Sequence, residues 1–225
     1  MTGSDLMRCV DAAHAAVLLH KEEIATLDQN IGDGDHVFNL IRGIEALQNM
    51  RGEIEPMGLT AALKTAAKKL LEAVGGSSGP LLATLLLGMS KATGTDDTDH
   101  GALARGFAEG VSGMQMRGKA GRGEKTMLDV LIPVSETFSR LSSDGASQAT
   151  ILKALKWEAQ RGMEATRDLI ATKGRASFLG ERAIGHIDPG ARSSQLIIAA
   201  VCDLFAAPVT TADTRGVTLE TRAAG

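Results

Sequence analysis

The chain contains no tyrosine and only one tryptophan, and aromatic residues make up 3% of it. Proteins that bind single-stranded nucleic acid stack the bases on aromatic side chains, which are scarce here. The formal net charge is −3, and no run of basic residues forms a positive stripe. These absences argue against a nucleic-acid-binding protein, so we expect no nucleic-acid partner.

Cysteine is equally scarce. Cys9 and Cys202 both lie in apolar, helical patterns and belong to no metal-binding motif. Reduced, buried thiols are therefore expected rather than a disulfide. The first residues have neither the basic region nor the apolar core of a signal peptide. Apolar runs stay far below the ~20 residues that cross a membrane. The expectation is a cytoplasmic protein with no membrane segment.

What the sequence does contain is helical periodicity, and the alternation typical of strands is nearly absent. We predict an all-α fold, one domain of about eight helices over residues 1–207. The residues from Pro208 onward have no apolar face, which predicts a disordered tail over 208–225. The expected helices contain the segments 6–24, 37–47, 63–74, 80–89, 103–114, 130–141, 147–171 and 194–206.

The segment Leu27–Asn39 is the most informative part of the sequence. It places Asp28, Asp33 and Asp35 close together, with glycines between them and an apolar helical pattern on each side. Crowded carboxylates repel one another unless a cation lies between them. Oxygen ligands without cysteine favour Mg²⁺ or Ca²⁺. Because a helix begins directly after the aspartates, the turn also lies where phosphate binds well.

A second loop, Gly75–Pro80, formally matches the G-x-S-x-G motif of serine hydrolases. That motif follows a β-strand, whereas an amphipathic helix precedes this loop. We interpret the loop as a helix N-terminus that receives phosphate, with a simple turn between helices as the alternative.

Basic residues gather in two further glycine-rich connections. The first contains Lys119, Arg122 and Lys125, which either contact phosphate or belong to a solvated loop. The second contains Arg175, whose guanidinium is suited to bidentate bonding with phosphate. Asp188-Pro189-Gly190 is expected to form a turn. The acidic segment 96–100 lacks flanking glycines, so we interpret it as a solvated loop with Asp99 as a helix N-cap.

Together these loops resemble the nucleotide-binding L subunit of dihydroxyacetone kinase, over roughly residues 5–206. The matching stretches are LDQNIGDGDHVFN, VGGSSGP, RGKAGRGEKTMLDV and KGRASFLGERAIGHIDPGA. The resemblance implies a barrel of eight antiparallel helices with the nucleotide bound in loops at one end. The family usually has glycine where this chain has Val37, so the bulk of Val37 is expected to narrow the approach to phosphate.

The resemblance also implies the roles of individual residues. Two Mg²⁺ ions would be held against the phosphates of ADP or ATP by Asp28, Asp33 and Asp35. Arg175 would act in catalysis. The nucleotide would be contacted by His36, Asn39, Ser77, Ser78, Gly118, Met127, Arg175, Asp188 and Gly190.

In that family the ketose is bound by a separate K subunit, and no segment of this chain corresponds to it. The resemblance therefore implies half of a kinase, with a K subunit as partner. The phosphoryl donor is either ATP or a phosphohistidine protein of the phosphotransferase system, which rephosphorylates bound ADP. Another ketose such as erythrulose is an open alternative, as are a nucleotide-sensing regulatory module and a helical adaptor without nucleotide.

Overall fold

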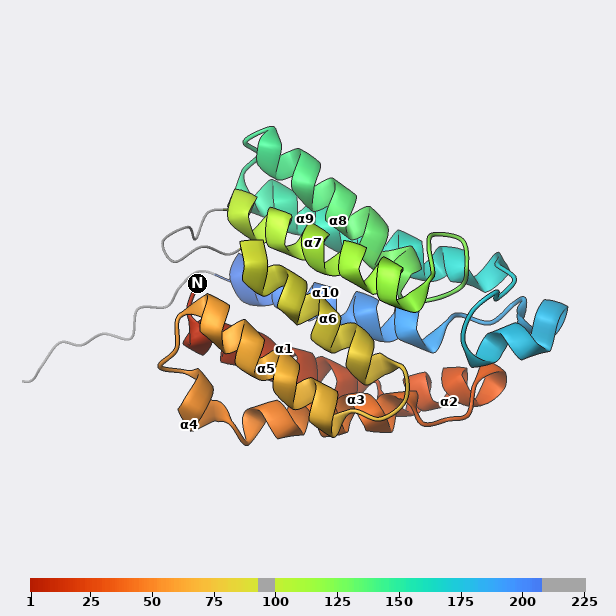
Figure 1. Cartoon of the computed structure of the whole chain (residues 1–225). Helices are drawn as coiled ribbons and strands as arrows, with labels where there is room; N and C mark the ends of the chain where they lie inside the picture. The colour runs from red at the N-terminus through yellow and green to blue at the C-terminus, as the bar shows by residue number, and fades with distance from the viewer. Residues whose placement is uncertain (93–99, 208–225) are drawn as a thin grey trace, which may run out of the picture.

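The computed structural model describes residues 1–92 and 100–207 (Figure 1). Within these ranges every regular element is a helix, and Thr2 and Gly58 form an isolated bridge. The α-helices are α1 (Gly3–Leu19), α2 (Lys21–Ile31), α3 (His36–Gln48), α4 (Arg51–Ile54), α5 (Leu59–Ala73), α6 (Ser78–Ala92), α7 (His100–Gly118), α8 (Leu128–Ser143), α9 (Gln148–Ala165) and α10 (Pro189–Ala206). Two 3-10 helices, η1 (Thr166–Asp168) and η2 (Arg175–Ala183), lie between α9 and α10.

The longer helices close into a ring. Its order is α1, α3, α5, α6, α7, α8, α9 and α10, and α10 packs back against α1. Successive helices of the ring run in opposite directions, as Figure 1 shows. An even number of helices allows the ring to close with every neighbouring pair antiparallel. The predicted all-α barrel is therefore confirmed.

Buried aliphatic side chains hold the ring together. One cluster joins α1, α2, α3 and α5 with Leu196 of α10, and a second joins α8, α9 and α10. Each fully buried aliphatic side chain contributes about 1.5–3 kcal/mol. Val37 is fully buried in the first cluster. The expectation that its bulk narrows the approach to phosphate is therefore wrong, since the side chain points into the core.

Several boundaries differ from the sequence prediction. The long helix predicted over 147–171 ends at Ala165, and the 3-10 helix η1 follows it. The first helix is broken at His20, whose backbone (φ −108°, ψ 17°) ends α1 and begins α2. The short helix α4 was not predicted. Asp188-Pro189-Gly190 is not a separate turn, because the Asp188 carboxylate accepts from the Ala191 N–H and Pro189 occupies the first turn of α10. The predicted acidic loop and N-cap at 96–99 lie outside the described residues.

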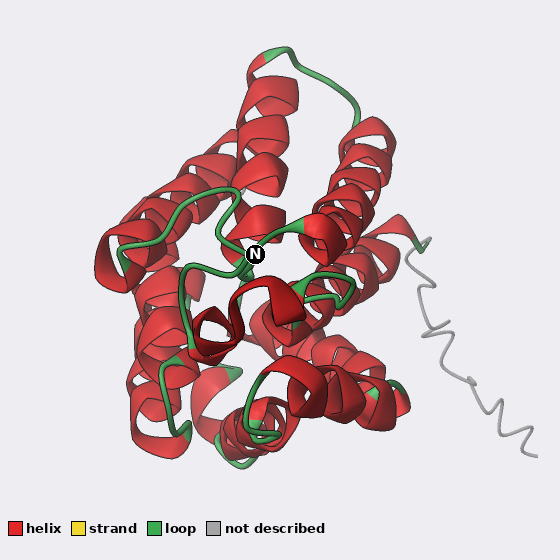
Figure 2. Cartoon of the chain, turned by 90° about the vertical axis from the view of Figure 1, so that its right-hand side faces the viewer, coloured by secondary structure: helices red, strands yellow, loops and turns green. Residues whose placement is uncertain are grey.

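The connections that carry the sequence motifs lie at one end of the barrel. They follow α2, α5, α7 and η2, at the right-hand end in Figure 1 and toward the viewer in Figure 2. The described helices include none that combines the length and apolarity of a membrane span.

Candidate functional site

A cavity of about 320 Å³ opens among these connections. Its walls come from the α2–α3 turn, the loop before α6, the loop before α8, the segment 173–176 and the start of α10. The structure brings every residue that the resemblance singled out to this one cavity. They are Asp28, Asp33, Asp35, His36, Asn39, Ser77, Ser78, Gly118, Met127, Arg175, Asp188 and Gly190.

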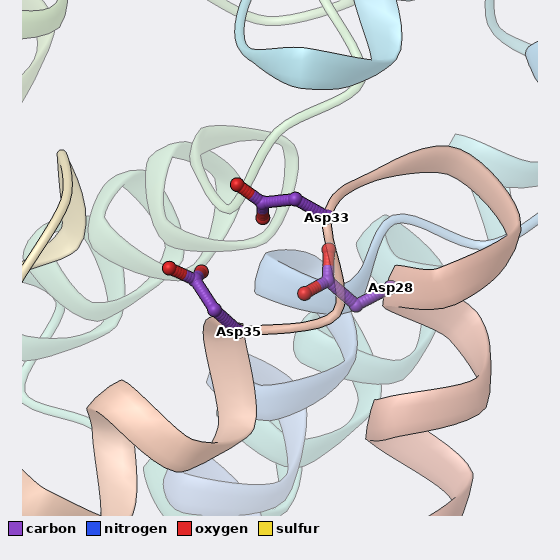
Figure 3. A group of neighbouring side chains, drawn as sticks. All are labelled: Asp28, Asp33 and Asp35. Carbon is purple, nitrogen blue, oxygen red and sulfur yellow. The ribbon is translucent and has the colours of Figure 1, made fainter.

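Three carboxylates converge at the α2–α3 turn (Figure 3). Asp28, Asp33 and Asp35 each offer an oxygen, and the three oxygens lie within 4.8 Å of one another. Asp28 is buried with 5% of its surface exposed, whereas the other two aspartates are exposed. Such a set of hard oxygen donors suits a divalent cation such as Mg²⁺, since charges of one sign at this spacing need a counter-ion.

The backbone of the turn explains why glycines separate the aspartates. Gly34 has φ +78°, which L side chains rarely adopt. A Cβ at Gly32 would lie 2.0 Å from the Asp28 Oδ1 atom. The other oxygen of Asp28 accepts a 2.9 Å hydrogen bond from the His36 backbone N–H. The buried carboxylate thus fixes the turn, Gly32 makes room for it, and Gly34 supplies the positive φ.

Four helices begin at the cavity. Cavity-lining residues stand at or just before the first residues of α3, α6, α8 and α10. Each helix start presents the positive end of a helix dipole, which favours an anion. Some first-turn N–H groups are already bonded within the protein, those of α8 to Thr126 and Met127 and that of Ala191 in α10 to Asp188. Converging helix N-termini beside a carboxylate cluster suit a ligand that brings phosphates together with a metal.

The loop before α6 contributes to this anion-binding wall. Ser77 is exposed and Ser78 half-buried, and both line the cavity at the start of α6. Asn39 of α3 lies against the start of this loop, since a Cβ at Gly75 would lie 3.3 Å from the Asn39 Oδ1 atom. A helix precedes the loop, as expected, so the loop lacks the strand that a serine nucleophile elbow requires.

His36 is held by a residue that sequence reasoning missed. The His36 Nε2 atom lies 2.9 Å from the Ser193 Oγ atom, and the Ser193 hydroxyl donates to the Gly190 carbonyl. The serine oxygen therefore accepts from the His36 ring N–H. Burial lowers the pKa of His36, opposed by the charges of Asp28 and Asp35. No local pattern marks Ser193, which is 157 positions away in the sequence.

The predicted cations do not behave alike. Arg175 reaches the carboxylates, where its Nη2 atom lies 2.8 Å from the Asp33 Oδ2 atom. Lys119 is exposed and does not line the cavity, and Arg122 pairs with Glu136 at 3.3 Å. Lys125 lines the cavity but is buried and donates to backbone carbonyls. The solvated-loop alternative thus describes Lys119 and Arg122, and neither alternative describes Lys125.

Asp188 closes the cavity at the start of α10. The pKa of Asp188 is raised to about 7, chiefly by burial and in smaller part by the charges of Asp129 and Asp28. The hydrogen bond from the Ala191 N–H and the charge of Lys125 act in the opposite direction. The side chain therefore exchanges its proton near neutral pH, within a wall that is otherwise made of helix starts.

Comparison with known proteins identifies the family. The model of the DAK2 domain matches residues 30–203. The chain belongs to the DAK2-domain family. The ADP-binding subunit DhaL of PEP-dependent dihydroxyacetone kinase 1 from Listeria innocua is 43% identical over 81% of this chain and 86% of the relative. The corresponding DhaL subunit from Escherichia coli is 38% identical over 84% of this chain and 88% of the relative. The resemblance to the L subunit is thereby confirmed.

A solved structure shares the DAK2-domain fold. The dihydroxyacetone kinase of C. freundii, in complex with AMP-PNP and Mg²⁺, matches with a TM-score of 0.69 at 21% identity. The match covers 88% of this chain but 33% of that kinase chain. This chain therefore spans about a third of the larger kinase, and the likeness concerns the fold.

Proposed function

We propose that this chain is the nucleotide-binding subunit of a ketose kinase of the dihydroxyacetone kinase type. It binds ADP or ATP with Mg²⁺ and transfers a phosphoryl group to a ketose on a separate K subunit. One observation carries the proposal: a single cavity joins the carboxylates of Asp28, Asp33 and Asp35, four helix N-termini and the guanidinium of Arg175. Phosphoryl transfer depends mostly on positioning and on neutralising phosphate charge, and this arrangement suits both tasks.

Asp28, Asp33 and Asp35 would hold the Mg²⁺. Oxygen donors at this spacing fit a hard cation, and no thiol or imidazole competes within the cluster. Bound Mg²⁺ neutralises charge on the phosphate oxygens. We propose two ions, because the carboxylates and the nucleotide phosphates together carry more negative charge than one divalent cation balances.

The remaining cavity residues would contact different parts of the nucleotide. Ser77 and Ser78 would donate to phosphate oxygens, together with the N–H groups at the start of α6. Arg175 would neutralise the transferred group, and His36 and Asn39 would contact the nucleotide from the start of α3. The nucleotide would also be contacted by residues at the end of α7, just before α8 and at the start of α10, namely Gly118, Met127, Asp188 and Gly190.

The side chains that line the cavity are consistent with a separate subunit for the ketose. Among the described residues that line it, His36 is the one histidine, and its Nε2 atom is already bonded to Ser193. The His186 backbone carbonyl accepts from Lys125, and His186 does not line the cavity. The described lining thus accounts for phosphates and metal, and we propose that the K subunit supplies the groups that hold a carbonyl substrate.

The names of the relatives support a phosphohistidine donor. The Listeria innocua and Escherichia coli subunits are called PEP-dependent, and a Lactococcus lactis relative, 40% identical, is called PTS-dependent. We therefore propose that a phosphohistidine protein of the phosphotransferase system rephosphorylates the bound ADP. A D-erythrulose kinase from Mycolicibacterium smegmatis is 32% identical over 87% of this chain, so erythrulose is the second candidate substrate.

The deciding experiment compares the purified chain with a reconstituted mixture. The chain alone should bind Mg-ADP by calorimetry but form no ketose phosphate, even with excess Mg-ATP. Addition of a cognate K subunit, with the phosphohistidine donor if ATP fails, should produce phosphorylated dihydroxyacetone or erythrulose. Robust turnover by the isolated chain would contradict the division of labour. Nucleotide binding without transfer in every mixture would favour a nucleotide-sensing module instead.

A further inference from the structure

Lys125 is the largest fully buried side chain among the described residues, with 1% of its surface exposed. Its ammonium group donates to the backbone carbonyls of Thr166 and His186, each at 2.5 Å, and lies 3.5 Å from the Arg167 carbonyl. Its backbone has φ +60°, in the left-handed region that favours glycine. The residue also lines the cavity.

The burial of the ammonium group and the positive φ of Lys125 both cost free energy. A buried cation loses its hydration, and a non-glycine residue with positive φ costs of the order of 1 kcal/mol or more. Carbonyl oxygens and the nearby charges of Asp188, Asp168 and Asp129 compensate the cation, although burial still lowers the pKa of Lys125. Backbone strain of this kind collects at ligand-binding sites, where the surrounding structure holds it in place. If the position of Lys125 had only to fill space in the interior, an apolar side chain would do so at a lower cost in free energy.

The carbonyls that Lys125 holds belong to the segments that place Asp188. Thr166 accepts through its hydroxyl oxygen from the Asp188 backbone N–H at 3.1 Å. The Arg167 carbonyl accepts from the Gly185 N–H at 2.8 Å. His186 lies two residues before Asp188, the N-cap of α10. One ammonium group thus ties the loop before α8 to η1 and to the residues that lead into α10.

These connections determine one wall of the cavity. Met127 lies two residues after Lys125, and a Cβ at Gly190 would lie 3.4 Å from the Met127 Cε atom. Met127, in the loop before α8, and Gly190, in the first turn of α10, therefore lie against each other where the ammonium group joins the two segments. If the cation were removed, three backbone carbonyls would lose their bond to the ammonium group, and no Lys125 side chain would tie the loop before α8 to the segments that lead into α10.

We propose that Lys125 is a positioning residue for nucleotide binding: its ammonium group holds the Met127 wall against the Asp188–Gly190 wall from within. The inference rests on the proposed function, because it assumes that a nucleotide occupies this cavity. Lys125 itself acts through the backbone and need not touch the nucleotide. The carboxylate cluster lies on α2 and the α2–α3 turn, outside the segments that Lys125 joins.

Chemical rescue tests this role. Lys125→Gly removes the whole side chain and suits the positive φ, so it leaves a hole with the shape of n-butylammonium. We expect the dissociation constant for Mg-ADP to rise at least ~tenfold, and n-butylammonium to restore most of the affinity. Two compounds at equal concentration should not restore the affinity: n-butanol, which lacks the charge, and tetramethylammonium, which lacks N–H donors. Lys119→Gly is the matched control, since Lys119 also has positive φ (47°) but is exposed.

The outcomes separate the inference from the proposed function. Failure of the wild-type chain to bind Mg-ADP would overturn both. If wild type binds, then unchanged affinity in Lys125→Gly, rescue by n-butanol as effective as by n-butylammonium, or an equal loss in Lys119→Gly would overturn the role of Lys125 alone. Should Lys125→Gly not fold, as judged by circular dichroism, Lys125→Met keeps the apolar stem. A folded Lys125→Met with wild-type affinity would again overturn the inference.

Discussion

The guanidinium of Arg175 lies 2.8 Å from the Asp33 carboxylate and so joins η2 to the α2–α3 turn. The two residues are more than a hundred positions apart in the sequence, yet both line the same cavity. The Arg175 side chain is 71% exposed, so it contributes little to the core. Its place beside the carboxylates is where a phosphate group held by a metal would meet it.

Arg175→Ala should impair transfer far more than folding. An exposed ion pair contributes only ~0–1 kcal/mol, so the melting temperature should stay within a few degrees of wild type. Turnover in the reconstituted kinase assay should fall at least ~tenfold, because a cation at the transferred group is lost. Arg182→Ala is the control, since Arg182 is exposed on the same helix but does not line the cavity. A large loss of stability would instead indicate a structural role.

Asp33→Ala and Asp35→Ala should each weaken Mg-ADP binding by at least ~1.4 kcal/mol, which is tenfold in Kd. Each substitution removes one of the converging oxygens and leaves the remaining carboxylates less able to hold a cation. Isothermal titration calorimetry measures the effect, with Asp144→Ala at the exposed end of α8 as control. Wild-type affinity in both variants would contradict the metal assignment.

Ser193→Ala should disturb His36 without disturbing the barrel. The lost hydrogen bond costs roughly 1 kcal/mol of stability, and the imidazole ring loses the partner that orients it. Ser90→Ala is a matched control, because Ser90 is equally buried and its hydroxyl also donates to the carbonyl three residues earlier. We expect only Ser193→Ala to weaken nucleotide binding. In a double-mutant cycle with His36→Gln, additive effects on binding would refute the coupling.

Asp188 should make the stability of the nucleotide-free protein depend on pH. Its pKa is about 7 in the fold against an ordinary 3.8, so between these values the folded state holds a proton that the unfolded state has lost. The contribution of Asp188 to stability is therefore complete below about pH 4 and is lost as the pH rises through 7, by up to ~1.4 kcal/mol per pH unit.

Asp188→Asn provides the comparison for this prediction, because the amide oxygen can still cap α10 but does not titrate. Urea unfolding at a series of pH values should show the stability difference, variant minus wild type, increasing from pH 4 to 7 and then levelling. Titrating groups that do not interact with Asp188, such as Glu23 with its pKa lowered by Arg192, cancel in this difference. A difference that does not change with pH would refute the raised pKa.

Local patterns were enough to predict the helices and the acidic turn. Asp28, Asp33 and Asp35 lie within one short segment, so their convergence depends on the geometry of a single turn. The break at His20 was not predicted, because the apolar periodicity continues across it. The start of α10 was placed too late, since Asp188-Pro189 can either form a turn or begin a helix. The tail over 208–225 stays a prediction.

The sequence by itself determined the fold class and the residue types of the site, because helical periodicity, glycine placement and carboxylate spacing act between neighbouring residues. The tertiary structure decided what each side chain does. Ser193 reaches His36 across 157 positions, and Lys125 finds its carbonyl partners at Thr166 and His186. From the sequence, a lysine in a glycine-rich loop is predicted to be solvated. Its burial is compensated by hydrogen-bond acceptors from distant segments of the chain. Such compensation has no local signal, so it becomes visible once the barrel has closed.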